Sequence, residues 1–119
     1  MTRLTVTFDA FDVVVVPFPF TERTSTKRRP ALVISNPRVF GLEAGHSVLA
    51  MITSAKNSDW PLDTPIQDLS AAGLSSASVV RMKLFTLDNQ LVVRKAGSLS
   101  DPDRLAVTAS LQRLLALQV

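Results

Sequence analysis

Two apolar runs on either side of a polar segment restrict the fold of this chain more than any other feature. Val13 to Val16 are four consecutive valines, and Ala31 to Ile34 form the second run. β-Branched side chains favour an extended backbone because their χ1 angle is stiff. Pro17 and Pro19 follow the valines and cannot continue a helix or donate to a sheet ladder. The pattern predicts two strands joined by a loop over residues 21–26.

Three cations, Lys27, Arg28 and Arg29, stand immediately before Pro30 at the start of the second run. The residue before a proline is held extended, so Arg29 would be presented at the beginning of a strand. A planar guanidinium in that position is suited to a phosphate group. The ordinary alternative is a solvated sheet edge, where Lys and Arg discourage edge-to-edge association. Charge alone leaves both interpretations open.

Composition limits the classes of protein that the chain can belong to. The 119 residues predict a single domain, residues 1–119, and 46% of them are hydrophobic, which is typical of a folding sequence. There is no cysteine, which excludes a disulfide scaffold, a thiolate metal site and a cysteine nucleophile. The single histidine, His46, cannot build a metal site by itself. We therefore expect no metal and no cofactor.

Charge and hydropathy bear on the partners. The net charge of +3, from 13 basic and 10 acidic side chains, permits an RNA partner without requiring one. No run approaches the roughly 20 apolar residues of a membrane span, and no signal segment opens the chain. We expect no membrane partner and a cytoplasmic location.

Further along the chain, short apolar runs predict more strands. Residues 47–54 and 78–81 are expected to be strands, and a short break precedes another at 83–87. Asp88 and Asn89 predict a hairpin turn into residues 91–94, and residues 38–46 are expected to form a loop. Residues 68–74 predict one helical turn closed by Gly73 in the left-handed region.

The last segment has the period of an amphipathic helix. Ser100 or Asp101 would cap it, with Pro102 near its first position. An apolar stripe at i, i+4, i+7 and i+8 would pack on the sheet: Val107, Leu111, Leu114 and Leu115. Many short strands with one terminal helix predict a mostly-β or α+β fold, namely a small curled antiparallel barrel.

Two segments leave alternatives open. Residues 1–10 alternate apolar and polar side chains, as in an added edge strand or an arm over a partner subunit. Trp60 lies in a polar loop, where it could stack a base or cover an edge of the core. The tendency of tryptophan to be buried favours the second alternative, in which Trp60 covers an edge of the core.

The opening segments resemble the MazF/PemK family of toxin ribonucleases. The residues that carry the resemblance are "DVVVVPFPFT" (residues 12–21) and "KRRPALVIS" (27–35), followed in order by 52–54 (Ile-Thr-Ser), 79–81 (Val-Val-Arg), 86–88 (Thr-Leu-Asp) and 97–100 (Gly-Ser-Leu-Ser). They extend over nearly the whole chain. Phe11 departs from the pattern, because the family usually has a glycine there.

The resemblance implies a fold and a function. The fold would be an SH3-like barrel of the CcdB/MazF/PemK type that works as a homodimer. The function would be that of a type II toxin, a metal-independent endoribonuclease that cleaves single-stranded mRNA at particular sequences. A short acidic antitoxin would hold the toxin inactive, and the toxin–antitoxin complex would bind DNA.

The resemblance also implies roles for particular residues. Arg29 would stabilise the reacting phosphate, Thr53 would orient it by a hydrogen bond, and Arg81 matches another arginine of the family's site. An ion pair between Arg81 and Asp68 or Asp88 is the structural alternative. The expected contacts with the rest of the RNA are Lys27, Arg28, Lys83 and Ser54.

The proton acceptor of the reaction is not apparent. Family members often have Asp or Glu one or two positions after this arginine, where this chain has Met82 and Lys83. Glu22, Asp88 and His46 are the remaining titratable candidates, and the sequence does not place any of them.

Two other functions stay open. One is a non-catalytic module that binds RNA or antitoxin. The other is a gyrase-directed poison of the CcdB type, which acts through a C-terminal Trp-Gly-Ile, whereas residues 117–119 of this chain are Leu-Gln-Val.

Overall fold

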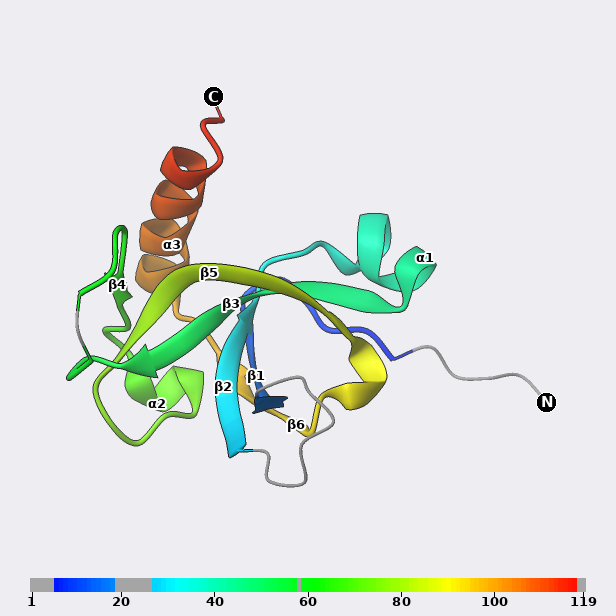
Figure 1. Ribbon diagram of the computed structural model, residues 1–119, viewed down its shortest axis with the longest axis horizontal. Coiled ribbons are helices and arrows are strands. Elements are labelled where there is room, and N and C mark those ends of the chain that lie inside the picture. Colours follow the sequence, from blue (N-terminus) through cyan, green and yellow to red (C-terminus); the bar gives the residue numbers. More distant parts are fainter. Residues whose placement is uncertain (1–5, 19–26, 58, 118–119) are drawn as a thin grey trace.

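Six antiparallel strands form one curled sheet, in the order β4-β5-β3-β2-β1-β6. The structure is a computed structural model and describes residues 6–18, 27–57 and 59–117 (Figure 1). The expected curled antiparallel barrel with a C-terminal helix is confirmed, as a half-barrel whose edge strands are β4 and β6. The strands are β1 (Asp12–Phe18), β2 (Lys27–Val33), β3 (His46–Ser54), β4 (Thr64–Pro65), β5 (Ser78–Asp88) and β6 (Arg94–Ser98).

The two strands predicted at the start of the chain pair with each other. In β1 and β2, Val14 lies opposite Ala31, and Val16 lies opposite Arg29. Side chains alternate between the faces of a sheet, so the four valines contribute to both faces. Three of them are buried, and Val15 is half-buried. This burial on both faces explains why the run is continuous rather than alternating.

Two hydrophobic clusters lie on opposite faces of the sheet. The helix-covered face carries the first cluster, which includes Leu32, Ile52, Val80 and, from α3 (Asp101–Leu114), Val107. The second face carries the other cluster: Val14, Val16, Ala31, Val33, Leu49 and Leu87. Residues next to each other in β2 or β3 therefore point to opposite faces, and this alternation decides which residues can meet.

The expected break after Arg81 is a bulge in a continuous strand. Ala50 pairs with Leu84, whereas the next residue, Met51, pairs with Arg81. Met82 and Lys83 are thus two extra residues in β5 with no partner in β3. Such an insertion bends the strand and increases its twist, and β5 arches over the sheet at this level (Figure 1).

The hairpin predicted at Asp88 and Asn89 is wrong, because β6 pairs with β1 and not with β5. The Asp88 carboxylate accepts the backbone N–H of Gln90 at 2.9 Å and starts a short 3-10 helix, η2 (Asn89–Leu91). The Asn89 side chain is buried, where it accepts from Ser47 Oγ at 2.6 Å and donates to the backbone oxygen of Val6 at 2.8 Å. These bonds turn the chain away from β5.

Residues 38–46, expected to be a loop, are mostly helical. Pro37–Gly41 form a π-helical turn, η1, and Leu42–Ala44 form α1. The side chain of Asn36 accepts the backbone N–H of Arg38 at 2.8 Å and so caps the first turn. An asparagine before proline is typical of a turn, but the same pair also starts a helix.

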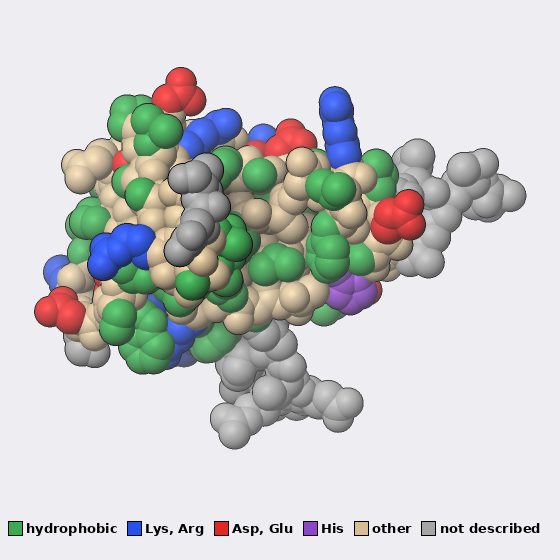
Figure 2. Space-filling model, turned by 90° about the horizontal axis from the view of Figure 1, so that it is seen from above, with side chains coloured by type: hydrophobic (Ala, Val, Ile, Leu, Met, Phe, Trp, Pro, Cys, Tyr) green, Lys and Arg blue, Asp and Glu red, His purple; other side chains and the backbone are tan. Residues whose placement is uncertain are grey.

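Helix α3 begins where the sequence predicts, with Ser100 as its N-cap. The apolar stripe is correct only for its first half: Val107 is buried and Leu111 packs on the core, whereas Leu114 and Leu115 are 39% and 51% exposed. The prediction failed there because α3 runs past the end of the sheet and projects from it (Figure 1). Figure 2 looks onto this end and shows hydrophobic side chains around the C-terminal end of α3.

Helix α2 (Leu69–Ala72) packs so closely on β6 that two positions require glycine. Gly73 has φ +72°, as predicted, and a Cβ there would lie 2.1 Å from the backbone oxygen of Ala96. A Cβ on Gly97 would lie 2.3 Å from the backbone oxygen of Ala71. Backbone thus meets backbone, which fixes the segment between α2 and β5.

Within the described residues, no helix is long and apolar enough to cross a membrane.

Candidate functional site

Strands β2 and β3 separate at one end of the sheet. Their pairing ends at Ala31 opposite Met51, although β2 begins at Lys27 and β3 continues to Ser54. Pro30, the next residue of β2, has no N–H with which to extend this ladder. Beyond that point both strands line a cavity of about 470 Å³, which we call the fork pocket. The cationic segment predicted from the sequence is thus one of its walls.

The alternation of side chains divides the predicted site residues into two groups. Ala31 shares a face with its partner Met51, and Met51 with its partner Arg81. Two residues further along their strands, Arg29 and Thr53 point to that same second face. The structure therefore brings the three residues expected to be catalytic onto one face of three neighbouring strands. Lys27 belongs to this face as well.

Arg28 and Ser54 point to the opposite, helix-covered face. The same face of the fork pocket receives Arg94, whose partner in β1 is Val15. The segment after α2 forms the far wall with the hydroxyl-bearing residues Ser75, Ser76 and Ser78. The pocket floor is apolar and is made by Val15, Pro30, Ile52, Leu74, Val93 and Ala96.

The described lining of the fork pocket contains three arginines, Arg28, Arg29 and Arg94, and no carboxylate. The ion pairs among the described residues are Arg81 with Asp63 and Lys95 with Asp12, so none of the three lining arginines forms one. The Arg29 guanidinium instead lies 5.9 Å from the centroid of the Phe18 ring. Three guanidinium groups around one cavity, without an ion pair to any described residue, make it suitable for a polyanion.

Thr53 is held by a hydrogen bond that leaves its own proton available. Asn57 Nδ2 donates to Thr53 Oγ1 at 2.5 Å, so the hydroxyl accepts there and its O–H can donate to another group. Ser54 Oγ similarly accepts the backbone N–H of Lys56 at 3.2 Å. The end of β3 thus presents two hydroxyl donors, one toward each face.

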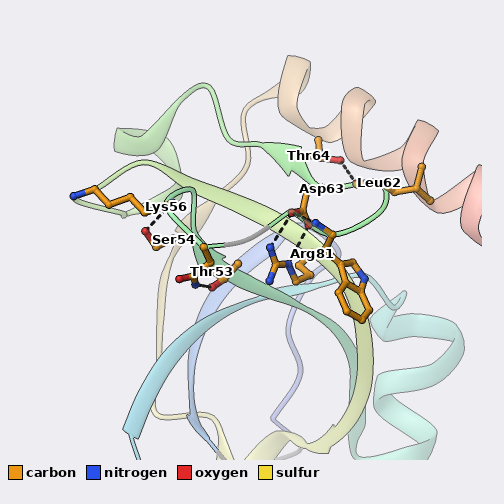
Figure 3. Close-up of polar contacts among 9 residues, drawn as sticks. Thr53, Ser54, Lys56, Leu62, Asp63, Thr64 and Arg81 are labelled. Carbon is orange, nitrogen blue, oxygen red and sulfur yellow. Dashed lines mark hydrogen bonds and ion pairs between the residues drawn. The ribbon is translucent and has the colours of Figure 1, made fainter.

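Arg81 is bound to an acid that was not among its expected partners. Its Nε donates to Asp63 Oδ1 at 3.1 Å and its Nη2 donates to Asp63 Oδ2 at 2.9 Å (Figure 3). The hydrogen bond to Asp63 raises the pKa of Arg81, which burial opposes, so the guanidinium stays charged. The expected ion pair with Asp68 or Asp88 is wrong, because both carboxylates cap helical turns instead.

Trp60 belongs to the same group of side chains. Its ring lies 4.3 Å from Lys83 Nζ and 6.0 Å from Arg81 Cζ, and its backbone N–H donates to Asp63 Oδ2 at 3.1 Å. The side chain is 41% exposed, and its ring lies against these two cations. The expectation that it covers an edge of the core stays a prediction. We call these four residues, Trp60, Asp63, Arg81 and Lys83, the Asp63 clamp. It ties the segment before β4 to β5.

The two described candidates for a proton acceptor, His46 and Asp88, do not lie at the fork pocket. Glu22 lies outside the described residues. His46 and Asp88 are cross-strand partners at the other end of β3, seven residues from Thr53, or roughly 23 Å at roughly 3.3 Å per residue. Met82, where the family often has an acid, is 7% exposed and packs in the first hydrophobic cluster. Among the described residues no group of His, Cys, Asp or Glu could hold a metal ion.

Sequence reasoning missed three residues of these sites. In the sequence, Arg94 and Lys95 are two adjacent cations with nothing to tell them apart. The pairing of β6 with β1 shows that Arg94 is the one that faces the pocket. Lys95 faces the other way and pairs with Asp12 at 3.2 Å. Asn57 lies four residues after Thr53, and this spacing is typical of a turn at the end of a strand. No local pattern in the sequence indicates that Asp63 pairs with Arg81.

Comparison with families matches the chain over residues 9–115 to the model described as PemK-like, MazF-like toxin of type II toxin–antitoxin system. The search of curated proteins finds no match to the chain.

Solved structures share the fold. A MazE–MazF complex from Deinococcus radiodurans is 22% identical with a TM-score of 0.73, covering 92% of this chain and 97% of that one. The Mycobacterium tuberculosis toxin MazF-mt6 is 18% identical with a TM-score of 0.71, covering 91% and 99%. An endoribonuclease in complex with its cognate antitoxin, from a mycobacterial species, is 14% identical with a TM-score of 0.70, covering 93% and 95%.

Proposed function

The chain belongs to the PemK-like, MazF-like toxin family of type II toxin–antitoxin systems, and from this membership we propose that it is an endoribonuclease that cleaves single-stranded RNA at the fork pocket. The observation that carries the proposal is the placement of Arg29 and Thr53 on one face of adjacent strands, beside a pocket lined by three arginines and no described carboxylate. A cation and a hydroxyl donor can both stabilise the negative charge that develops on a phosphate during cleavage.

In the proposed reaction, the RNA 2′-hydroxyl attacks the adjacent phosphorus. A new bond forms between the 2′ oxygen and phosphorus, and the bond from phosphorus to the 5′ oxygen breaks. The 2′-hydroxyl loses a proton and the leaving 5′ oxygen gains one, so the products are a cyclic phosphate and a free 5′-hydroxyl. Negative charge grows on the phosphate oxygens in the transition state, where electrostatic donors act most strongly.

Arg29 and Thr53 would divide this task. The Arg29 guanidinium would donate two parallel hydrogen bonds to the phosphate. Thr53 would donate its O–H, because Asn57 already occupies an acceptor site on Thr53 Oγ1. Arg81 shares their face, but its contacts with Asp63 favour a supporting role. Lys27, Arg28, Lys83 and Ser54 would contact the remaining RNA.

Cleavage of a long RNA in EDTA tests the proposal. We expect fragments that end in a cyclic phosphate, and we expect them without added metal because the proposed steps use side chains alone. Intact RNA after long incubation at high protein concentration would instead favour a non-catalytic module that binds RNA. That second function has its own support, since no imidazole or carboxylate is among the described lining residues of the pocket.

We also propose that the protein is a homodimer, the commonest closed oligomer. Large apolar side chains remain exposed on α3 and in the segment that follows it, namely Leu105, Leu114, Leu115 and Leu117. Surplus apolar surface of this kind is typical of an interface. Sedimentation equilibrium at micromolar concentration should give the mass of two chains, and the mass of one chain would exclude the dimer.

A short acidic antitoxin is the third proposed partner. An acidic disordered segment that folds on binding would neutralise the three arginines that line the fork pocket. The solved complex of a mycobacterial endoribonuclease with its cognate antitoxin is a precedent in the same fold. Saturating antitoxin should displace RNA. Undiminished RNA binding in its presence would exclude a shared site.

A further inference from the structure

We propose that Arg94, together with Arg28, binds the RNA phosphodiester next to the cleaved one, on the face of the sheet opposite Arg29 and Thr53. This inference rests on the proposed function and assigns the helix-covered half of the fork pocket to one flanking nucleotide. RNA would then cross the end of the sheet between β2 and β3, with successive phosphates on its two faces.

The register of three strands carries the argument. Arg94 lies opposite Val15, and Val15 lies opposite Pro30, so the three side chains share the helix-covered face. Arg28 is two residues before Pro30 in β2, so its side chain points to the same face. Two strand spacings, roughly 10 Å, separate the backbones of β6 and β2. Arginine side chains extending from both sides can reach one phosphate between them.

The electrostatic environment separates Arg94 from other cations of the chain. Its neighbour Lys95 is neutralised by Asp12, and Arg81 is neutralised by Asp63. Arg104 donates from Nε to the backbone oxygen of Leu99 at 2.9 Å. Arg28 and Arg94 are exposed and have no ion pair among the described residues. Two arginines beside one cavity that no described carboxylate neutralises are arranged for an external anion.

The rest of the pocket fits a nucleotide better than a bare phosphate. About 470 Å³ is within the range of roughly 300–1,000 Å³ for pockets that hold small molecules. The floor of Val15, Pro30 and Ile52 is apolar and can take a ribose and a base. Ser78 Oγ donates to the backbone oxygen of Ser76 at 2.8 Å and so fixes the wall that presents the exposed side chains of Ser75 and Ser76.

Binding of an RNA that cannot be cleaved tests the pocket separately from catalysis. The probe is a pool of random 20-nucleotide RNAs with every 2′-hydroxyl methylated, and affinity is measured against salt concentration. Loss of one phosphate contact on a single strand reduces the slope of log K against log salt by about 0.7. We expect this reduction for Arg94→Ala and for Arg28→Ala. Arg94→Lys should restore the slope, because it keeps the charge.

Arg38→Ala is the matched control, because Arg38 is an exposed arginine on η1 and does not line the pocket. It removes the same charge and should leave the slope unchanged. In cleavage assays Arg94→Ala should raise KM and leave kcat nearly unchanged, since a flanking contact is made equally in the ground and transition states. Thermal melts check that each variant is folded.

The outcomes distinguish this inference from the proposed function. An unchanged salt slope in both the Arg94 and Arg28 variants would overturn the subsite, even if Arg29→Ala abolishes cleavage and the ribonuclease function stands. A reduced slope supports the subsite, even if the wild-type protein never cleaves RNA. An unchanged slope together with weaker antitoxin binding would assign the pocket to an acidic peptide and overturn the inference.

Discussion

The fork pocket and the Asp63 clamp are two arginine sites on the same sheet, and they differ in whether the protein supplies the anion. In the clamp, Arg81 is 8% exposed and both carboxylate oxygens of Asp63 bind it. In the fork pocket, Arg28, Arg29 and Arg94 have no ion pair among the described residues. The difference indicates that the clamp stabilises the fold, whereas the fork pocket has positive charge available for a ligand.

The sequence indicates both Arg29 and Arg81 as candidates, but it does not show which of them the protein pairs with a carboxylate. Whether each one is paired depends on Asp63, which lies 18 residues before Arg81 in a segment with no periodic signal. Four substitutions test the comparison.

Replacement of Arg29 should have the largest effect. If Arg29 stabilises charge that develops in the transition state, Arg29→Ala should reduce kcat by about a hundredfold or more, the usual cost of losing such a donor. RNA binding should fall much less, because the phosphate contacts proposed for Arg28 and Arg94 would remain. Single-turnover cleavage and equilibrium binding, measured in parallel, separate the two effects. Cleavage equal to that of the wild type would remove Arg29 from the mechanism.

Replacement of Thr53 should have the next largest effect. Thr53→Val keeps the shape and removes the O–H, and a neutral hydrogen bond contributes about 1 kcal/mol, so cleavage should slow by about tenfold or less. Thr53→Ser keeps the hydroxyl and should be close to the wild type. If Thr53→Val cleaves as fast as the wild type, the hydroxyl of Thr53 contributes nothing to the reaction, and the proposed donor is wrong.

The outline of this site could be predicted because its signals are local. The valine run, Arg29 before Pro30 and the left-handed Gly73 each depend on a few adjacent residues, and all three features are present. Long-range pairing could not be predicted in this way. The pairing of β6 with β1 brings Arg94 to the pocket, and nothing within a few residues of Arg94 indicates it.

Replacement of Asp63 should affect stability more than activity. Asp63→Asn removes the charge that holds Arg81, so the melting temperature should fall, while cleavage changes only a few-fold because Arg29 and Thr53 remain. Asp88→Asn is the matched control: it makes the same chemical change at a half-buried carboxylate that caps η2, and asparagine caps nearly as well. A cleavage loss as large as that of Arg29→Ala would show that the clamp belongs to the reaction.

Replacement of Lys83 should have the smallest effect and the opposite sign. Lys83 is exposed at the bulge of β5 near the position where the family often has an acid, so Lys83→Glu should speed cleavage by a few-fold if a carboxylate there can accept the 2′ proton. The corresponding change at Met82 is unsuitable, because Met82 is buried and a carboxylate there would have to leave water. Loss of the contact between Lys83 and Trp60 should cost about 0.5–1 kcal/mol of stability.

Lys83→Gln separates the two ways in which this variant could act. Glutamine removes the positive charge and the contact with Trp60 but cannot accept a proton. If Lys83→Glu is faster than Lys83→Gln across the neutral pH range, a carboxylate at the bulge can accept the 2′ proton. If the two variants cleave equally fast, any difference in rate from the wild type comes from loss of the lysine charge alone. The clamp then contributes nothing to proton transfer, and Arg29 and Thr53 carry the reaction by charge stabilisation.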